Sequence, residues 1–290
     1  METTNKQIFF LRTSDEPLEC FEACALYSAA THNPLARVTW FYSYSNGNKD
    51  QKKIPLQLPA PLLELGNVEA RLIAFAGVFA RTPLHTWYRS GKWNVSDFVK
   101  RIRFLSDAAR LAYLFKHGGA YLDTDSISLR SIAPLRNSIA YQNRRELANG
   151  FMKFEAGHPF LRLAMEKEAA EFDPKLKEIN FGPLLVTSVY QKYKPRPSSN
   201  EWPSVNALAE QLFYPFNYAT AHFMLQKNGS APERESKLNQ AYSLHLWRNK
   251  MRSIHHNPTV QPPIDSILYH AIGKHCEPFL SNWTNGYPCM

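Results

Sequence analysis

Long hydrophobic runs are missing from this sequence of 290 residues. No stretch approaches the roughly 18 apolar residues that a membrane span needs, and the opening METTNKQIFFLRTSDEP lacks the pattern of a signal peptide. The sequence also lacks the CxxC pairs that are typical of zinc sites and the signatures of nucleic-acid-binding modules. These absences argue against a membrane span within these residues, a cysteine-bound zinc ion and a nucleic-acid partner.

Cysteine is scarce, with four in the chain. Cys20 and Cys24 lie four residues apart on a predicted helix, whereas Cys276 and Cys289 flank the C-terminal tail. In an oxidising compartment, a Cys276–Cys289 disulfide would fasten this tail. Free thiols are an equally good interpretation, so the sequence leaves the pairing open.

Positive charge is in excess, because 34 Lys and Arg stand against 25 Asp and Glu, a formal net charge of +9. A hydrophobic content of 44% with 20% charged residues is typical of a globular protein. The basic balance favours an anionic partner, such as a phosphate-bearing ligand or a membrane surface.

A strand, a helix and a second strand are predicted in that order near the N-terminus. The apolar run IFFLR (8–12) is typical of a buried strand, and RVTWFYSY (37–44) is rich in β-branched and aromatic residues. Between them, residues 17–33 have the pattern of a helix that Pro34 closes. This order favours a parallel, doubly wound α/β sheet. We find no repeat and no domain boundary, and expect one domain over residues 1–290.

The longest helical pattern runs from about residue 96 to residue 117, with apolar side chains at steps of three and four. Gly118-Gly119 ends it where a left-handed C-cap is needed. Shorter elements follow. We expect strands at 137–142, 150–154 and 242–247, helices at 158–172, 182–192 and 264–275, and loops at 45–55, 194–204 and 226–240.

Two aspartates, Asp123 and Asp125, directly follow the apolar run at 120–122. In extended backbone alternate side chains share a face, so both carboxylates can point the same way. Side by side they repel each other unless a cation or a proton lies between them, and oxygen ligands of this kind suit Mg²⁺ or Mn²⁺. Most such pairs are solvated turns, but open α/β sheets bind ligands at the carboxyl ends of their strands. The pair is therefore a candidate metal site.

Two classes of enzyme place an acidic pair after a strand. In a phosphotransferase of the haloacid-dehalogenase type, the first aspartate would be a nucleophile and the second a general acid. That class also needs a second acidic pair at a later strand end, which we do not find. In a nucleotide-sugar transferase, the pair would instead hold a metal ion on the departing nucleoside diphosphate. The residues upstream of the pair favour the second class.

The segment SDAARLAYLFKHGGAYLDTD (106–125) resembles the block SD-x-x-R…GG-x-YLD-x-D of the α-1,4-glycosyltransferases with a DXD sugar-binding motif. Further matches follow in the family's order along nearly the whole chain. They are IFFLRTSD (8–15), ACALYSAATHNP (23–34), RTPLHTWY (81–88), ANGFMKFE (148–155), GPLLV (182–186), FYP (213–215) and HLW (245–247). The resemblance implies an α/β fold of GT-A type, in which helices flank a mixed, mainly parallel sheet.

The resemblance also implies roles for individual residues. It implies metal ligation by Asp123, Asp125 and His245, with Mn²⁺ as the ion and Mg²⁺ as the alternative; catalysis by Asp123, Asp125 and Asn149; and donor binding by Thr13, Ser14, Ser106, Asp107, Arg110, Gly182 and His245. Structural alternatives stay open for several of them. His245 could be a structural strand residue, Asp107 and Arg110 an exposed helical ion pair, and Thr13 a helix cap.

The implied reaction moves galactose or N-acetylgalactosamine from a UDP-sugar, with retention, in α-1,4 linkage to a terminal sugar of a glycolipid at a membrane surface. The implied location is the Golgi lumen, as a type II membrane protein whose anchor is absent from this chain. The alternatives are an inactive UDP- or carbohydrate-binding module of the same fold and an α-1,4-N-acetylglucosaminyltransferase. Phe181, Leu184 and Arg12 depart from the family pattern. These departures put the choice of sugar and acceptor in doubt.

Overall fold

The computed structural model describes residues 6–13, 17–43, 57–175, 181–193, 203–226, 236, 238–255, 262–285 and 289. Within these residues no helix is long and apolar enough to cross a membrane. The predicted loop at 45–55 and most of those at 194–204 and 226–240 fall outside them, as does Ser14.

Seven strands form the central sheet in the order β3-β2-β1-β4-β7-β6-β8. Their bounds are β1 Gln7–Arg12, β2 Arg37–Tyr42, β3 Val68–Leu72, β4 Gly119–Leu122, β6 Ser138–Tyr141, β7 Leu147–Phe154 and β8 Asn206–Leu208. β1 pairs in parallel with β2 and β4, and β2 with β3, as the strand-helix-strand order predicts. Among these strands, β7 alone runs antiparallel to its neighbours β4 and β6. The expected mixed, mainly parallel sheet is confirmed.

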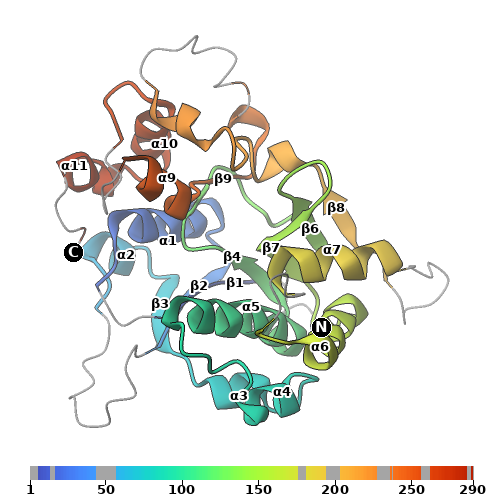
Figure 1. Ribbon diagram of the computed structural model, residues 1–290. Helices are drawn as coiled ribbons and strands as arrows, with labels where there is room; N and C mark the ends of the chain where they lie inside the picture. The colour runs from blue at the N-terminus through green and yellow to red at the C-terminus, as the bar shows by residue number, and fades with distance from the viewer. Residues whose placement is uncertain are drawn as a thin grey trace.

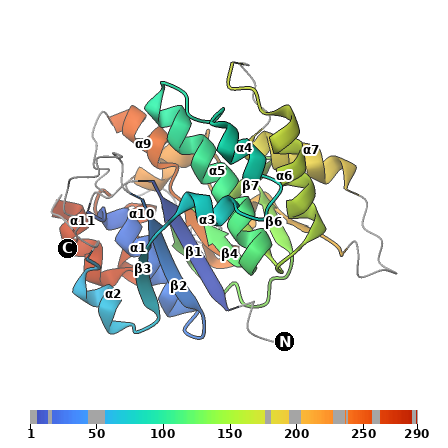
Figure 2. The ribbon, with the colours of Figure 1, turned by 90° about the horizontal axis from the view of Figure 1, so that it is seen from below.

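Helices cover both faces of the sheet (Figures 1 and 2). One face carries α3 Phe75–Phe79, α4 His85–Ser90, α5 Phe98–His117, α6 Pro159–Glu171 and α7 Gly182–Lys192; the other carries α1 Cys20–His32, α2 Ala60–Glu64, α10 Ile267–His275 and α11 Glu277–Asn285. The remaining elements are the 3-10 helices η1 Glu210–Leu212 and η2 Ala221–Leu225, the helix α9 Arg248–His255, and a two-stranded sheet of β5 Ser126–Ser128 and β9 Ser243–His245. A separate apolar cluster fills each face.

The helix predicted at 96–117 is α5. The Asp97 side chain accepts a hydrogen bond from the backbone N–H of Lys100 and caps the first turn. Gly118, with φ +68°, lets the chain turn directly into β4. An added Cβ at Gly119 would lie 2.6 Å from the carbonyl oxygen of Gln7, so a side chain there would push β4 away from β1. The two glycines therefore place the start of β4 tightly against the first strand.

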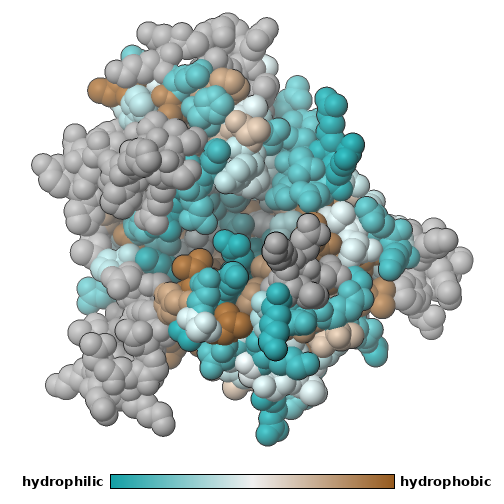
Figure 3. All heavy atoms as spheres, viewed as in Figure 1, coloured by the Kyte–Doolittle hydropathy of each residue, from teal (hydrophilic) through white to brown (hydrophobic). Residues whose placement is uncertain are grey.

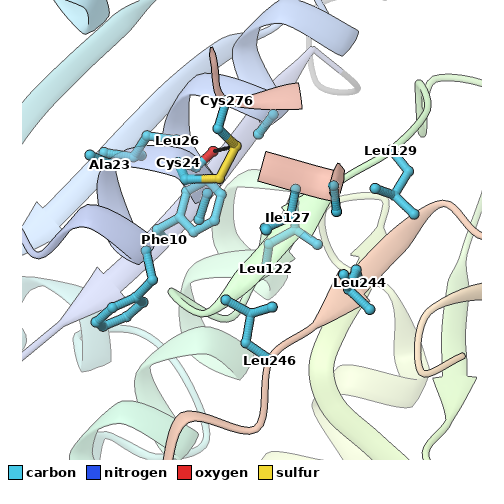
Figure 4. Close-up of a cluster of buried hydrophobic side chains, with 14 of the residues drawn as sticks. Phe10, Ala23, Cys24, Leu26, Leu122, Ile127, Leu129, Leu244, Leu246 and Cys276 are labelled. Atoms are coloured by element: carbon cyan, nitrogen blue, oxygen red, sulfur yellow. Dashed lines mark hydrogen bonds between the residues drawn. A yellow bond between two sulfur atoms is a disulfide. The ribbon is translucent and has the colours of Figure 1, made fainter. Parts of the chain in front are cut away.

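The small sheet of β5 and β9 rests on α1 through one of the apolar clusters (Figure 4). Ile127 of β5 and Leu244 of β9 are fully buried beside Phe10 of β1. Burying an Ile or Leu side chain of this kind stabilises the fold by roughly 1.5–3 kcal/mol. This packing fixes the position of the end of β9, which carries His245.

Neither of the alternatives that the sequence leaves open, a Cys276–Cys289 disulfide or free thiols, is found in the structure. Cys20 pairs with Cys289, and Cys24 pairs with Cys276. Because residues four apart share one face of a helix, both cysteines of α1 can meet the packed C-terminal helices. The two bridges join the N-terminal helix to the C-terminal end over sequence separations of 269 and 252 residues.

We expect removal of the first disulfide to lower the free energy of unfolding less than removal of the second does. If Cys20→Ser and Cys289→Ser open one bridge, the other still closes the long loop, and the free energy of unfolding falls by about 3 kcal/mol. When Cys24→Ser and Cys276→Ser are added, the long loop opens as well, and the total loss is roughly 8 kcal/mol. Denaturant unfolding of the two variants measures both values. A full loss on opening the first bridge would contradict the shared-loop interpretation.

The acid stability of the fold depends in part on His158, which caps α6. This side chain is buried, its Nδ1 accepts from the backbone N–H of Phe160, and burial lowers its pKa to about 4. Between pH 6.5 and 4 the unfolded chain therefore binds a proton that the folded chain does not, so stability falls as the pH falls. The difference corresponds to roughly 3 kcal/mol.

His158→Asn keeps a capping acceptor and removes the titration, so we expect a flatter decline of unfolding free energy between pH 7 and pH 4.5. Urea unfolding at the two pH values tests this, with the wild-type protein as the control. An unchanged pH dependence in the variant would show that other groups cause the decline.

Candidate active site

The chemically active side chains gather at the carboxyl edge of the parallel strands. β1 and β4 both end there, at Arg12 and Leu122, so Thr13 and Asp123 emerge at the same edge. β7 runs the opposite way, and its first half, with Asn149 and Gly150, lies at this edge. The backbone N–H of Asp123 donates to the carbonyl oxygen of Gly150 at 2.8 Å. The space-filling view has a hollow near the middle of the face on which β4, β7 and β9 lie (Figure 3).

The acidic pair meets His245 at the end of β9. The Nε2 atom of His245 lies 3.5 Å from Oδ2 of Asp123 and 3.2 Å from Oδ1 of Asp125, so both carboxylates face one point, as predicted. The pairing of β5 with β9 places His245 opposite Ser126, one residue beyond Asp125. One ligand atom from each of the three residues lies within 4.8 Å of the others. Two carboxylates and an imidazole at this spacing fit a divalent cation.

Arg110 of α5 holds the carboxylate of Asp123 in place. Its Nη1 donates to Oδ1 of Asp123 at 3.0 Å and to the backbone carbonyl of Asn149 at 2.9 Å. Its Nη2 donates to Oγ of Ser106 at 3.0 Å and lies 3.1 Å from Oδ1 of Asp107. Arg110 is 6% exposed, so it is not the exposed helical ion pair of the structural alternative. Its donors are directed at protein acceptors, and it orders α5, β4 and β7 relative to one another.

A second cluster lies beside Arg110. Asn149 donates through Nδ2 to Oδ1 of Asp107 at 2.8 Å. An added Cβ at Gly182 would lie 3.0 Å from Oδ2 of Asp107 and 3.6 Å from Nδ2 of Asn149, and Gly182 has φ +58°. Three expected site residues from α5, β7 and α7 are thus brought together. The close approach and the left-handed backbone both require glycine at the start of α7.

The electrostatics of the site follow from burial and from the guanidinium. Burial acts to raise the pKa of Asp123, but Arg110 and then His245 outweigh it and hold this pKa below its usual range. Burial raises the pKa of Asp107 against the opposing effect of Arg110. Burial lowers the pKa of His245, but the carboxylates of Asp125 and Asp123 outweigh it and raise this pKa. Asp123 is therefore ionised and ready to bind a cation at neutral pH.

The sequence prediction missed two tyrosines of the site. Tyr121 donates through its hydroxyl to Oδ1 of Asp123 at 2.7 Å, and the Arg110 guanidinium lies 4.3 Å from the centre of its ring. The ring of Tyr214 lies 5.3 Å from that of His245. Both tyrosines are buried, and a buried tyrosine in a sequence is indistinguishable from a core residue. The FYP match at 213–215 was the one available signal for Tyr214.

Glu168 of α6 is a further residue near the site, and no motif in the sequence singles it out. It is 1% exposed, and neither carboxylate oxygen has a hydrogen-bond partner among the described residues. Burial, together with the negative charge of Asp107, raises the pKa of Glu168 well above its ordinary value. Burial of Glu168 beside the site therefore favours its protonated form more than exposure to water would.

In the part of the chain that the structure describes, the remaining expected residues make no recorded contact with this cluster. Thr13 is half-buried after β1, and its role in donor binding stays a prediction. Ser14 lies outside the described residues. Of the departures from the family pattern, Phe181 packs edge-on against Phe104 with ring centroids 4.9 Å apart, and Leu184 is 45% exposed.

Comparisons with known proteins agree with this geometry. A family model described as the alpha 1,4-glycosyltransferase conserved region matches residues 153–282, which include Gly182 and His245. A second, described as the glycosyltransferase sugar-binding region containing the DXD motif, matches residues 67–146, which include Asp123 and Asp125. The two halves of the candidate metal site therefore fall in two separate matches.

Two curated relatives cover most of the chain. The lactosylceramide 4-alpha-galactosyltransferase of Mus musculus is 32% identical over 253 residues, which are 86% of this chain and 69% of that protein. The alpha-1,4-N-acetylglucosaminyltransferase of Homo sapiens is 31% identical over 253 residues, which are 83% of this chain and 71% of that protein. Among solved structures, the PaToxG glycosyltransferase has a TM-score of 0.49 at 17% identity and covers 65% of this chain and 68% of that chain. That structural likeness carries no argument by itself.

The match to a DXD-containing sugar-binding region, with the acidic pair at the carboxyl edge of the sheet, identifies a glycosyltransferase that uses a nucleotide sugar. This chain belongs to the α-1,4-glycosyltransferase family.

The close approach of β7 to the acidic pair gives a test of the metal site. A Cβ added at Gly150 would lie 2.5 Å from Oδ2 of Asp123 and 3.0 Å from the Tyr214 hydroxyl, so Gly150→Ala must displace the carboxylate. We expect the Mn²⁺ affinity of Gly150→Ala to fall at least about tenfold. Electron paramagnetic resonance of Mn²⁺ in the presence of UDP measures this affinity. Gly273→Ala is the matched control, because its Cβ would meet only Leu280 at 3.6 Å. Unchanged Mn²⁺ affinity in Gly150→Ala would contradict the site.

Proposed function

We propose that this chain transfers galactose or N-acetylgalactosamine from a UDP-sugar, in α-1,4 linkage, to the terminal sugar of a glycolipid such as lactosylceramide. The single observation that carries the proposal is the convergence of Asp123, Asp125 and His245 at one point of the sheet edge. The relatives named above support the linkage and the type of acceptor.

The donor set favours Mn²⁺ over Mg²⁺ as the bound ion. Mg²⁺ prefers oxygen ligands alone, whereas an imidazole nitrogen is acceptable to the transition metals. Asp123, Asp125 and His245 would hold the ion. When bound, it would neutralise negative charge that develops on the diphosphate as the glycosidic bond breaks.

The protein's own groups would prepare this site before the substrate arrives. Arg110 and Tyr121 hold Oδ1 of Asp123, which leaves Oδ2 directed at the common point with His245. Asp125 is oriented by the backbone N–H of Arg248, which donates to its Oδ2 at 2.9 Å. Preorganised ligands of this kind avoid reorganisation during the reaction.

The configuration of the anomeric carbon would be retained if the acceptor hydroxyl attacks it from the same face that the diphosphate leaves. The departing phosphate could itself accept the proton of that hydroxyl. A covalent route would need an accessible carboxylate near the donor sugar. In the described part of the site, Asp107 is engaged by Arg110 and Asn149, and Glu168 is 1% exposed. These contacts support the front-face route.

We further propose that the enzyme acts in the Golgi lumen, at a membrane surface. Two disulfides favour an oxidising compartment of this kind. The net charge of +9 favours contact with anionic headgroups.

Loss of either aspartate should abolish transfer without unfolding the protein. We expect Asp123→Asn and Asp125→Asn to lower kcat by roughly 100-fold or more, because the ion is lost from the transition state. Asp265→Asn, at an exposed residue with φ +66°, is the matched control. EDTA should inactivate the wild-type protein, and Mn²⁺ should restore it better than Mg²⁺. Full turnover by Asp125→Asn in EDTA would refute the metal role.

A panel of UDP-sugars, scored by UDP release with a lactose-type acceptor and followed by linkage analysis, tests the donor. UDP-galactose or UDP-N-acetylgalactosamine should rank first. A preference for UDP-N-acetylglucosamine would instead assign the sister activity. UDP binding without turnover of any sugar would identify an inactive binding module.

A further inference from the structure

A row of aromatic side chains leads from the metal ligand His245 towards solvent. The ring of Trp247 lies 4.5 Å from that of His245, and the ring of Tyr218 lies 5.6 Å from that of Trp247 and almost perpendicular to it. We call Trp247 and Tyr218 the aromatic ledge. The ledge begins at the candidate metal site and ends at a side chain that is 55% exposed.

Trp247 is held rigidly in an unusual conformation. Its φ of +51° lies in the left-handed region, which bulky residues rarely adopt. Its indole N–H donates to the carbonyl oxygen of Phe216 at 2.7 Å, and its backbone N–H donates to Nδ1 of His245 at 3.2 Å. Strained backbone that is kept in place by such contacts is concentrated at functional sites. The contacts fix the indole ring relative to the metal ligand.

Tyr218 differs from the other aromatic residues near the site because its ring is available to a ligand. Tyr214, on the inner side, is 3% exposed and packs on both His245 and Trp247. Tyr218 has Trp247 at one side, and the ammonium group of Lys250 lies 5.0 Å from its ring centre. Tyr218 is 55% exposed, so a ligand in solution can reach its ring.

We propose that the aromatic ledge is the acceptor subsite, where the terminal galactose of the acceptor stacks on the ring of Tyr218, next to the almost perpendicular ring of Trp247. A pyranose has one face of C–H groups and a rim of hydroxyls, so it suits an aromatic surface bordered by polar groups such as Lys250 and the tyrosine hydroxyl. Stacked there, the sugar would present its hydroxyls towards the cation and the donor. This inference rests on the proposed function.

The nucleotide base is the other planar group that could stack on an aromatic ring. Tyr218 lies between η1 and η2, and Trp247 lies between β9 and α9. The family resemblance instead implies that the nucleotide binds near Thr13, at the end of β1. The ledge therefore favours the acceptor, and the experiment separates the two ligands.

The test compares Tyr218→Ala with Tyr218→Phe, which keeps the ring. With methyl β-lactoside as acceptor, we expect Tyr218→Ala to raise the acceptor KM roughly tenfold, which corresponds to about 1.4 kcal/mol. The KM for the UDP-sugar and the slow hydrolysis of the UDP-sugar without acceptor should stay within about twofold, since the ring does not touch the donor. Tyr218→Phe should behave as wild type. Leu35→Ala is the control for loss of exposed apolar surface, because Leu35 is 82% exposed and precedes β2 at the opposite edge of the sheet.

A binding measurement separates this inference from the proposed function. Saturation-transfer NMR with methyl β-lactoside needs no turnover, and the signal should be present in wild type and Tyr218→Phe and largely lost in Tyr218→Ala. If wild type binds the lactoside in this way but transfers no sugar, the ledge stands and the proposed function fails. The ledge is refuted if wild type does not bind the lactoside or if Tyr218→Ala matches wild type in both measurements. A raised KM for the UDP-sugar alone would also refute it, because the ring would then bind the donor.

Discussion

The buried ion pair between Arg110 and Asp123 is the interaction on which the rest of the site depends. Both charges are taken largely out of water, and their mutual attraction must offset that desolvation. Removing one partner of such a pair typically costs about 3–5 kcal/mol, because the other charge is left unpaired. The pair also joins α5 to β4, and through the Asn149 carbonyl to β7. The position of α5 therefore determines the position of Oδ1 of Asp123.

A strand pairing from the C-terminal half completes the arrangement. His245 reaches the acidic pair because β9 pairs with β5, and that small sheet is held by apolar packing on α1. The same helix carries Cys20 and Cys24, which are bonded to the C-terminal segment. Packing, strand pairing and covalent bonds therefore all hold the C-terminal half against the N-terminal half at the place where their ligands meet.

The sequence predicted best those elements that repeat a pattern over many residues or end on a clear signal. α5 and β1 agree with expectation because α5 covers five turns and ends at a glycine, and β1 is a continuous apolar run. The short α2, α3, α4 and β8 were not foreseen, since elements of three to six residues contain too little periodicity. The disulfide pairing was missed because it depends on how α10 and α11 pack on α1, which no local pattern records.

The candidate site was foreseen unevenly for a similar reason. Its acidic pair, Asn149 and His245 could be identified from ordered motifs, and the structure brings them together. Glu168 lies in none of those motifs. Tyr121 and Tyr214 lie in two of them, YLD-x-D and FYP, but they were given no role, because a polar atom on a buried residue acquires a role only through neighbours that are distant in the chain. Asn149 lies inside β7, because this strand begins three residues before the predicted start at 150.

The two-residue spacing between His245 and Trp247 has an evolutionary consequence. One short stretch of backbone carries both the candidate metal ligand His245 and Trp247, whose backbone N–H donates to Nδ1 of that histidine. If this stretch contacts the acceptor as proposed, a mutation that reshapes it would also move the candidate metal ligand, so selection can seldom act on the two properties separately here. Divergence among family members should therefore be found mainly at Tyr218, where a side chain can vary while the geometry of that stretch is inherited unchanged.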